Sequence, residues 1–335
     1  MSFLNHTKIA VIGGGSWATA LIKILCEQNQ VQIRWWLRNQ KDIDHIRKFN
    51  HNPSYLSDVV LSPKKVKVFE KTTDAVKGAD YIILAVPAAF IQESLQHLSP
   101  KHLQGKRIVS AIKGMVPGQN ALVTDWAAEA FGIEMKDTCV IAGPCHAEEV
   151  ALEKQSYLTI ASTECPAAED FAELMTCRYV TANALDDLYG VEYAAVMKNI
   201  VALACGITHG LGYGDNFQAV LVSNAMQEIG SLVTALDPRE RNLSSSAYLG
   251  DLLVTAYSQF SRNRLFGNMI GRGYSVKAAQ LEMKMIAEGY YATRSIQELN
   301  KTYHVNLPIT NAVYSILYED HAPATVMNEL KKLLK

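Results

Sequence analysis

The sequence predicts an α/β fold in which a doubly wound sheet is followed by an all-helical domain. In the first half, short runs rich in β-branched and aromatic residues alternate with helix-like stretches. Residues 81–86 are continuously apolar, which is typical of a parallel strand buried on both faces. From about Asp186 only helical spacing remains. We therefore expect one domain over residues 1–185 and a second over 186–335, with a ligand cleft between them.

Each expected element follows from its local pattern, and glycine-containing breaks separate the helices of the second half. The expected strands are residues 8–12, 31–37, 66–69, 81–86, 107–112, 138–142, 157–161 and 179–182. The expected helices are residues 17–28, 88–98 and 119–131 in the first domain, and 191–209, 217–236, 249–260, 276–285 and 307–318 in the second.

Composition excludes several classes of protein. The 335 residues suit two domains, at about 150 residues each. Lys and Arg number 32 against 33 Asp and Glu, so we expect neither nucleic acid nor an anionic membrane as partner, although a compact anionic ligand stays possible.

The longest uninterrupted apolar run, near residues 82–91, contains Pro87 and is about half of what a bilayer requires, so no membrane span is expected. The amino terminus reads directly into a strand, without the features of a targeting segment. The six cysteines show no CxxC spacing and predict reduced thiols in a cytoplasmic protein, with no metal site.

A glycine-rich turn links the first expected strand to the first expected helix. Its sequence, Gly13-Gly14-Gly15-Ser16-Trp17-Ala18, fits the dinucleotide fingerprint G-x-G-x-x-A of a Rossmann-type domain. Gly13 permits the tight turn, Gly15 lets the backbone approach a pyrophosphate, and the phosphates would lie at the helix start, at Ser16 and Trp17. An ordinary tight turn is the alternative.

Arg38 lies just after the second expected strand, where an acidic residue would bind the adenosine 2'-hydroxyl of NAD. A guanidinium suits the 2'-phosphate of NADP or stacks on adenine. Arg38 thus favours NADP(H) over NAD(H). A solvated surface arginine is the alternative, which leaves NAD(H) open.

Five segments together resemble the NAD(P)-dependent glycerol-3-phosphate dehydrogenases, in the family's order and over essentially the whole chain. They are the fingerprint, Ala-Ile-Lys-Gly at 111–114, Ala-Gly-Pro-Cys-His-Ala-Glu-Glu-Val at 142–150, residues 191–200 with Lys198-Asn199, and Gly-Asp-Leu-Leu-Val-Thr at 250–255 with Ser-Arg-Asn at 261–263. The chain departs from the family pattern at Cys145, usually serine, and at Ser223-Asn224, usually Arg-Gly.

The resemblance implies reversible hydride transfer between a nicotinamide and C2 of a three-carbon phosphate, reducing dihydroxyacetone phosphate to sn-glycerol 3-phosphate for glycerophospholipid synthesis. It also implies a homodimer. The reaction requires a group that exchanges a proton with the C2 oxygen, a group that stabilises negative charge there, and a cation for the phosphate.

Lys198 is the candidate for proton exchange. Its neighbours one helical turn away are Ala194, Ala195, Val201 and Ala202, so the lysine is expected to be partly desolvated, which lowers its pKa toward neutrality. Spacing alone fits equally well a lysine that extends from an apolar stripe to solvent. The match to the family's catalytic Lys-Asn pair favours catalysis.

Lys113 and Asp251 are expected beside Lys198. Lys113 follows the strand 107–112, and the resemblance implies that it contacts cofactor and substrate; a solvated lysine in a turn is the alternative. Asp251 follows Gly250 and has the pattern of a helix N-cap. The resemblance places its carboxylate near Lys198 and a substrate hydroxyl, a role compatible with capping. Thr255 would share its face.

The remaining site residues are carried over from the family. Ser261, Arg262 and Asn263 suit the substrate phosphate, with Arg262 also near the cofactor; a solvated helix end is the alternative. The resemblance further assigns Gly143 and Cys145 to the substrate, and Ala147, Ile286 and Glu288 to the cofactor. Cys145 is expected to pack, because hydride transfer needs no covalent nucleophile.

Two other functions stay open. One is another two-domain dehydrogenase of the β-hydroxyacid or ketopantoate type, a class that lacks the 142–150 and 250–263 segments together. The other is a regulator that senses NADP without turnover. Such a sensor needs only the fingerprint, so Lys113, Lys198, Asp251 and Arg262 argue against it.

Overall fold

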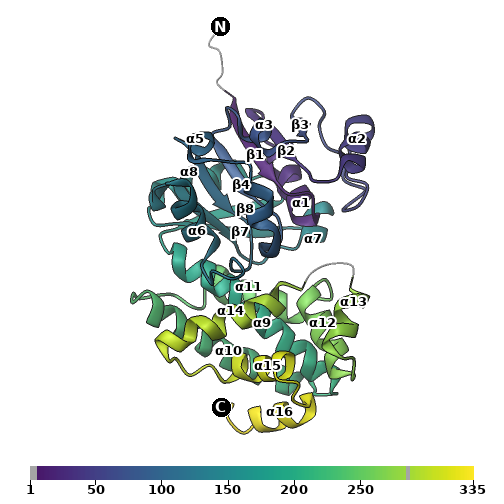
Figure 1. The fold of residues 1–335 in the computed structure, drawn as a ribbon, viewed down its shortest axis with the longest axis vertical. Helices are drawn as coiled ribbons and strands as arrows, with labels where there is room; N and C mark the ends of the chain where they lie inside the picture. Colours follow the sequence, from purple (N-terminus) through teal and green to yellow (C-terminus); the bar gives the residue numbers. More distant parts are fainter. Residues whose placement is uncertain (1–5, 284–286) are drawn as a thin grey trace. The chain divides into compact units, whose positions relative to one another are not determined.

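The computed structural model describes residues 6–283 and 287–335, which form two compact units (Figure 1). The first unit runs to Ile112 and resumes over Val123–Leu188. The second unit contains Lys113–Leu122 and Tyr189–Lys335. The units thus differ from the two continuous domains expected over 1–185 and 186–335, because Lys113–Leu122 pack with the helices of the second unit.

The described part of the first unit contains an eight-stranded sheet in the order β3-β2-β1-β4-β5-β6-β7-β8. Strands β1 to β6 pair in parallel, in the order of a Rossmann sheet, which confirms the predicted fold class. Strand β7 pairs antiparallel to β6, and β8 pairs parallel to β7, a reversal that the sequence did not predict. The strands are β1 (Thr7–Ile12), β2 (Val31–Trp36), β3 (Val66–Phe69), β4 (Tyr81–Leu84), β5 (Arg107–Ser110), β6 (Thr138–Ala142), β7 (Ser156–Ser162) and β8 (Val180–Leu185).

Two groups of helices cover the sheet (Figure 1). Helices α3 and α6 contact β1 to β3, β5 and β6, and α5 packs against both helices. Helices α1 and α8 contact each other and β1, β2 and β6 to β8, and α7 packs against α1. The central strands are therefore buried on both faces, as the continuous apolar run of β4 predicted. The helices are α1 (Ser16–Cys26), α2 (Gln40–Phe49), α3 (Thr72–Val76), α4 (Ile91–Leu95), α5 (Pro100–Leu103), α6 (Val123–Phe131), α7 (Ala147–Ala151) and α8 (Cys165–Met175), with 3-10 turns η1 (Ala88–Phe90) and η2 (Met135–Asp137).

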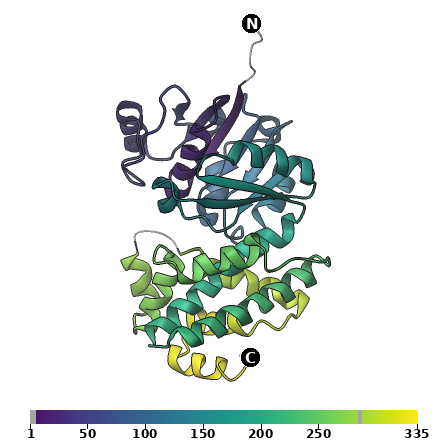
Figure 2. The same ribbon diagram turned by 180° about the vertical axis from the view of Figure 1, so that it is seen from behind.

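The second unit is helical in its described residues, with one isolated bridge between Val116 and Ala121 (Figure 2). That bridge lies where the helix expected over 119–131 should begin, so the helix starts only at Val123. The helices are α9 (Leu188–Gly210), α10 (Asp215–Leu236), a π-helical turn η3 (Ser246–Gly250), α11 (Asp251–Tyr257), α12 (Arg262–Gly271), α13 (Val276–Glu282), α14 (Glu288–Tyr303), α15 (Pro308–Tyr318) and α16 (Pro323–Leu330).

Helices α9 and α10 are long and apolar enough, by length and composition, to cross a membrane. The apolar window of α9 is wholly buried, as in the core helix of a soluble protein, whereas that of α10 is less than half buried. Neither helix is an uninterrupted apolar run, because polar pairs such as Lys198-Asn199 and Gln227-Glu228 interrupt them, so the sequence pattern did not indicate a membrane span.

Glycines let α9 and α12 pack backbone against backbone. A Cβ built on Gly206 of α9 would lie 2.1 Å from the carbonyl oxygen of Arg264, and one built on Gly267 of α12 would lie 2.2 Å from that of Leu203. Real side chains do not tolerate such distances. The two helices therefore approach closely only because both positions lack a side chain, and this fixes α12 relative to the C-terminal half of α9.

The substitution Gly267→Ala is expected to lower the free energy of unfolding by about 3 kcal/mol, because the added methyl group must push two backbones apart. Thermal or urea unfolding measures the change. Gly214→Ser is the matched control: no atom lies within 4 Å of a Cβ built there, and serine is a good residue for this N-cap position of α10. Equal stability of the two variants would contradict the packing argument.

Candidate active site

Lys198, Asp251 and Lys113 form a charged cluster inside the second unit. Lys198 lies in the middle of α9 and donates a hydrogen bond to Asp251 Oδ1, and both side chains are almost wholly buried. Lys113 lies in the segment 113–122, and its Nζ is 3.9 Å from the same oxygen. The structure thus brings together the three residues that the sequence singled out for catalysis.

Burial lowers the pKa of the Lys198 ammonium to about 7, because a charge in an apolar surrounding loses its hydration. Repulsion by Lys113 acts in the same direction. Attraction to the Asp251 carboxylate raises the pKa and so opposes both effects, which keeps the protonated form of Lys198 populated near neutral pH. A lysine in this state can release and recover a proton near neutral pH.

Asp251 is positioned by an irregular helix. The expected N-cap geometry is wrong: Gly250 has helical dihedrals (φ −61°, ψ −46°), and the π-helical turn Ser246–Gly250 runs directly into α11. Asp251 is therefore the first residue of α11 instead of its N-cap, and its carboxylate accepts a hydrogen bond from Lys198. Thr255 lies one turn later and donates from Oγ1 to the carbonyl oxygen of Asp251, at 2.7 Å.

A relay of two buried amides ties this cluster to its surroundings. Asn199 donates from Nδ2 to the carbonyl oxygen of Lys113 at 2.7 Å, which holds the segment 113–122 against α9. Asn263 donates from Nδ2 to Asn199 Oδ1 at 2.8 Å, and its own Oδ1 accepts from the backbone N–H of Gly289 at 2.9 Å. Sequence reasoning did not select Asn199, although its place beside Lys198 was a signal.

Ser261 and Arg262 begin helix α12, where backbone N–H groups favour an anion. Ser261 caps the helix by accepting from the N–H of Arg264 at 3.3 Å, and Arg262 is half-buried at the first helical position. Asn263 is buried and bonded at both ends of its amide, so its expected contact with substrate stays a prediction. Glu288 is the first residue of α14, and Ile286 lies outside the described residues.

The glycine turn of the first unit fits a dinucleotide. Gly13 has φ +138°, and a Cβ there would lie 2.3 Å from the carbonyl oxygen of Ala85. Gly15 is the N-cap of α1 without any capping side chain, and a Cβ there would meet no atom within 4 Å. The start of α1, at Ser16 and Trp17, thus has room beside Gly15 and no side-chain cap bond from its N-cap residue, which suits a pyrophosphate.

Arg38 follows β2, is exposed, and lies with its guanidinium carbon 5.2 Å from the centroid of the Phe90 ring. It lines a pocket of about 440 Å³ beyond the carboxyl ends of β2 and β3, together with Lys71. In a parallel sheet this is the edge where ligands bind. The two cations give the pocket a place for a phosphate, and Glu70 and Glu93 line it too.

Gly143 and Cys145 lie in the connection between β6 and α7, and Ala147 is the first residue of α7, all in the first unit. Gly143 has φ +105°, and a Cβ there would lie 2.8 Å from the carbonyl oxygen of Tyr157, so this position requires glycine. Cys145 and Ala147 are buried, and the roles predicted for these residues at substrate and cofactor stay predictions.

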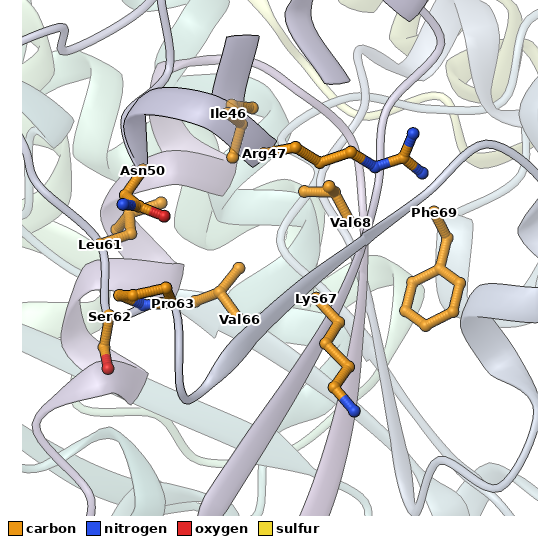
Figure 3. A pocket seen from close by; sticks show the side chains of 10 residues that line it. All are labelled: Ile46, Arg47, Asn50, Leu61, Ser62, Pro63, Val66, Lys67, Val68 and Phe69. Carbon is orange, nitrogen blue, oxygen red and sulfur yellow. The ribbon is translucent and has the colours of Figure 1, made fainter. Parts of the chain in front are cut away.

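A second pocket, of about 370 Å³, lies between α2 and β3 and contains none of the predicted site residues (Figure 3). Its walls are mostly apolar, with Arg47 and Lys67 as cations. Arg47 already pairs with Glu70 at 3.0 Å. Among the residues that the structure describes, no group of three or more His, Cys, Asp or Glu side chains could hold a metal ion.

At Ser223-Asn224, where the chain departs from the family pattern, the structure shows what the asparagine binds. Asn224 donates from Nδ2 to the carbonyl oxygens of Val220 and Lys335, and its Oδ1 accepts from the N–H of Lys335. Ser223 bonds only within its own helix among the contacts described, donating to Val220. The side chain of Asn224 thus fastens residue 335 to α10.

Two comparisons decide the family of the chain. Residues 8–168 match the family described as NAD-dependent glycerol-3-phosphate dehydrogenase N-terminus, and residues 187–328 match the corresponding C-terminus. The chain belongs to the NAD-dependent glycerol-3-phosphate dehydrogenase family. The glycerol-3-phosphate dehydrogenase [NAD(P)+] of Bacillus velezensis is 36% identical over 329 residues, which cover 98% of this chain and 95% of that protein.

Solved structures agree with this assignment. The crystal structure of glycerol-3-phosphate dehydrogenase from Coxiella burnetii has a TM-score of 0.90 and 30% identity, over 97% of this chain and 98% of that chain. A ketopantoate reductase of the PanE/ApbA family from Ralstonia eutropha JMP134 has a TM-score of 0.58 and 14% identity, over 97% of this chain and all of that one. The second likeness shows a shared fold alone.

Proposed function

We propose that this chain catalyses the NAD(P)-dependent interconversion of dihydroxyacetone phosphate and sn-glycerol 3-phosphate. The observation that carries the proposal is the buried cluster of Lys198, Asp251 and Lys113 in a chain of this family. A regulator that only senses a dinucleotide has no use for a buried lysine whose pKa is lowered to near 7, because binding needs no proton exchange.

The proton chemistry follows from the geometry. When a nicotinamide coenzyme is bound, it supplies the hydride for C2 of the ketone. The Lys198 ammonium donates its proton to the C2 oxygen as negative charge develops there, and in the oxidising direction the neutral amine takes that proton back. Asp251 holds Lys198 in place, and the second ammonium, of Lys113, stabilises charge on the oxygen.

The phosphate of the substrate is assigned to the start of α12. Arg262 offers a planar, permanently charged donor group there, and the free N–H groups of the first helical turn add to it. Ser261 fixes the beginning of the helix by capping it. Phosphate binding and proton exchange thus depend on neighbouring helices, because α12 packs directly on α9.

Three finer properties are part of this proposal. We expect NADP(H) to be preferred over NAD(H), because Arg38 and Lys71 line one pocket at the adenosine end of the sheet. We expect a homodimer, which α10 supports: its apolar window is less than half buried within one chain. The free thiols of all six cysteines support a cytoplasmic enzyme, in which the product would serve glycerophospholipid synthesis.

Oxidation of NADPH and NADH with dihydroxyacetone phosphate tests substrate and cofactor together. We expect turnover with both and a lower KM for NADPH. Ketopantoate, offered in parallel, tests the hydroxyacid alternative, and turnover of ketopantoate but not of dihydroxyacetone phosphate would contradict the proposal.

Lys198→Ala is expected to lower kcat at least about 1,000-fold, because it removes the buried amine whose lowered pKa suits proton exchange near neutral pH. Cofactor binding, followed by the fluorescence of bound NADPH, should survive, since the glycine turn lies in the first unit. Near-normal reduction of dihydroxyacetone phosphate by this variant would remove Lys198 from the mechanism.

Arg262→Ala is expected to raise the KM for dihydroxyacetone phosphate about 100-fold, because a charge-assisted bond to the phosphate is lost. Arg272→Ala is the matched control, since Arg272 follows the other end of the same helix. Steady-state kinetics with the substrate varied at saturating NADPH measures both. An unchanged KM in the first variant would move the phosphate site elsewhere.

Asp251→Asn is expected to shift the pH dependence of reduction. Lys198 must be protonated to donate, so kcat of the wild-type protein should fall as pH rises through about 7. The carboxylate raises the pKa of Lys198, so its removal lowers that pKa and moves the fall in kcat to lower pH. Lys113→Met should move it to higher pH, because the Lys113 ammonium lowers the same pKa. A shift of both variants in one direction would contradict this electrostatic account.

A further inference from the structure

The three carbonyl groups of the glycine turn are all bound by the protein interior. Trp35 donates from its indole Nε1 to the carbonyl oxygen of Gly13 at 2.6 Å. Asn52 donates from Nδ2 to that of Gly14 at 3.0 Å. Thr19 donates to that of Gly15 from its backbone N–H at 3.0 Å and from Oγ1 at 3.1 Å.

Asn52 uses every hydrogen-bonding position that its side chain has. Its Nδ2 donates to Thr19 Oγ1 at 2.9 Å as well as to Gly14, and its Oδ1 accepts from the N–H groups of Ser54 and Tyr55. The residue has no exposed surface, and it reaches the turn from the connection between α2 and β3, 38 positions along the chain from Gly14. A fully bonded, buried amide holds one orientation, because any rotation breaks several bonds at once.

Trp35 is also fully buried, and its neighbour shows that the contact is specific to its position. Trp36 belongs to the same strand but donates from its indole to the carbonyl oxygen of Glu70, away from the glycine turn. Of these two neighbouring indoles, that of Trp35 lies on the other face of β2 and binds Gly13.

Fixing a carbonyl also fixes the N–H group that follows it. In a planar trans peptide the C=O and the next N–H point in opposite directions. With the oxygens of Gly13, Gly14 and Gly15 bound inward, the N–H groups of Gly14, Gly15 and Ser16 are directed the other way. A Cβ built on Gly15 would meet no atom within 4 Å, so there is room beside the turn, and successive backbone N–H groups of this kind suit an anion.

We propose that Trp35 and Asn52 are positioning residues for the pyrophosphate of the dinucleotide, acting through the carbonyl groups of Gly13 and Gly14. Neither side chain needs to touch the cofactor. Each keeps a peptide group in the orientation that the phosphates require, so that the orientation is set before binding. This inference rests on the proposed use of a dinucleotide by this chain.

Direct binding tests the inference without turnover. Purified full-length Trp35→Phe, Asn52→Asp and Thr19→Val are titrated with NADPH and with ADP-ribose, which carries the pyrophosphate, and with adenosine, which does not. Trp35→Phe removes the indole N–H and keeps most of the ring volume. Asn52→Asp keeps the acceptor for Ser54 and Tyr55 but places a carboxylate oxygen opposite the carbonyl of Gly14.

We expect each variant to bind NADPH and ADP-ribose about tenfold more weakly and adenosine unchanged. The KM for NADPH should rise while the KM for dihydroxyacetone phosphate does not. Trp126→Phe removes an indole N–H from α6 of the same unit and should leave all three dissociation constants as in the wild-type protein. Thr19→Ser, which retains the hydroxyl group, should restore most of what Thr19→Val loses.

Other outcomes separate the possibilities. Folded variants that bind ADP-ribose with the wild-type dissociation constant would overturn the proposal, as would an equal loss for adenosine, which indicates general loosening of the unit. If Asn52→Asp fails to fold, the Thr19→Val and Thr19→Ser pair, which removes and retains the hydroxyl group that Asn52 binds, decides the role of Asn52. A wild-type protein that binds NADPH but does not reduce dihydroxyacetone phosphate would overturn the proposed reaction and leave this inference standing.

Discussion

Burial of the Lys198 ammonium is the constraint on which the second unit depends. A charge inside an apolar helix bundle is strongly disfavoured unless a partner of opposite charge holds it. Asp251 is that partner, and it stands where the π-helical turn Ser246–Gly250 runs into α11. The buried ammonium and the carboxylate that holds it therefore come from two helices that must keep their relative places.

The surrounding helices keep this pair in a defined place. Glycines at 206 and 267 bring α12 against α9, and a third, at 289, lets the start of α14 approach Asn199: a Cβ there would lie 2.5 Å from its carbonyl oxygen. The amides of Asn199 and Asn263 then join four segments through bonds of 2.7 to 2.9 Å. Because the amides are buried, each bond is costly to break, and the cluster is rigid without a covalent link.

Sequence patterns predicted the features that depend on neighbouring residues in the chain, such as the positions of the strands and the burial of Lys198. The eight strands lie within a few residues of their expected places, since continuous apolar runs signal buried strands. The apolar neighbours of Lys198 predicted its desolvation, and the structure buries its side chain, which lowers the pKa of the ammonium.

The contacts that hold these elements together could not be predicted. Contacts between distant segments determine three such features: the antiparallel pairing of β7, the packing of residues 113–122 with the second unit, and the hydrogen bond between the amides of Asn199 and Asn263. Helix α12 carries polar residues at its start and only weak apolar spacing, so the sequence gave little sign of it.

The near-neutral charge of the chain says little about its affinity for anions, and the glycine turn shows why. A pyrophosphate would be met there by backbone N–H groups, which carry partial positive charge but do not count in a sum of Lys, Arg, Asp and Glu. What makes such donors effective is their fixed direction, and in this chain that direction is set by a tryptophan and an asparagine, both uncharged. Anion binding by a protein of net charge −1 is thus a matter of orientation within the fold.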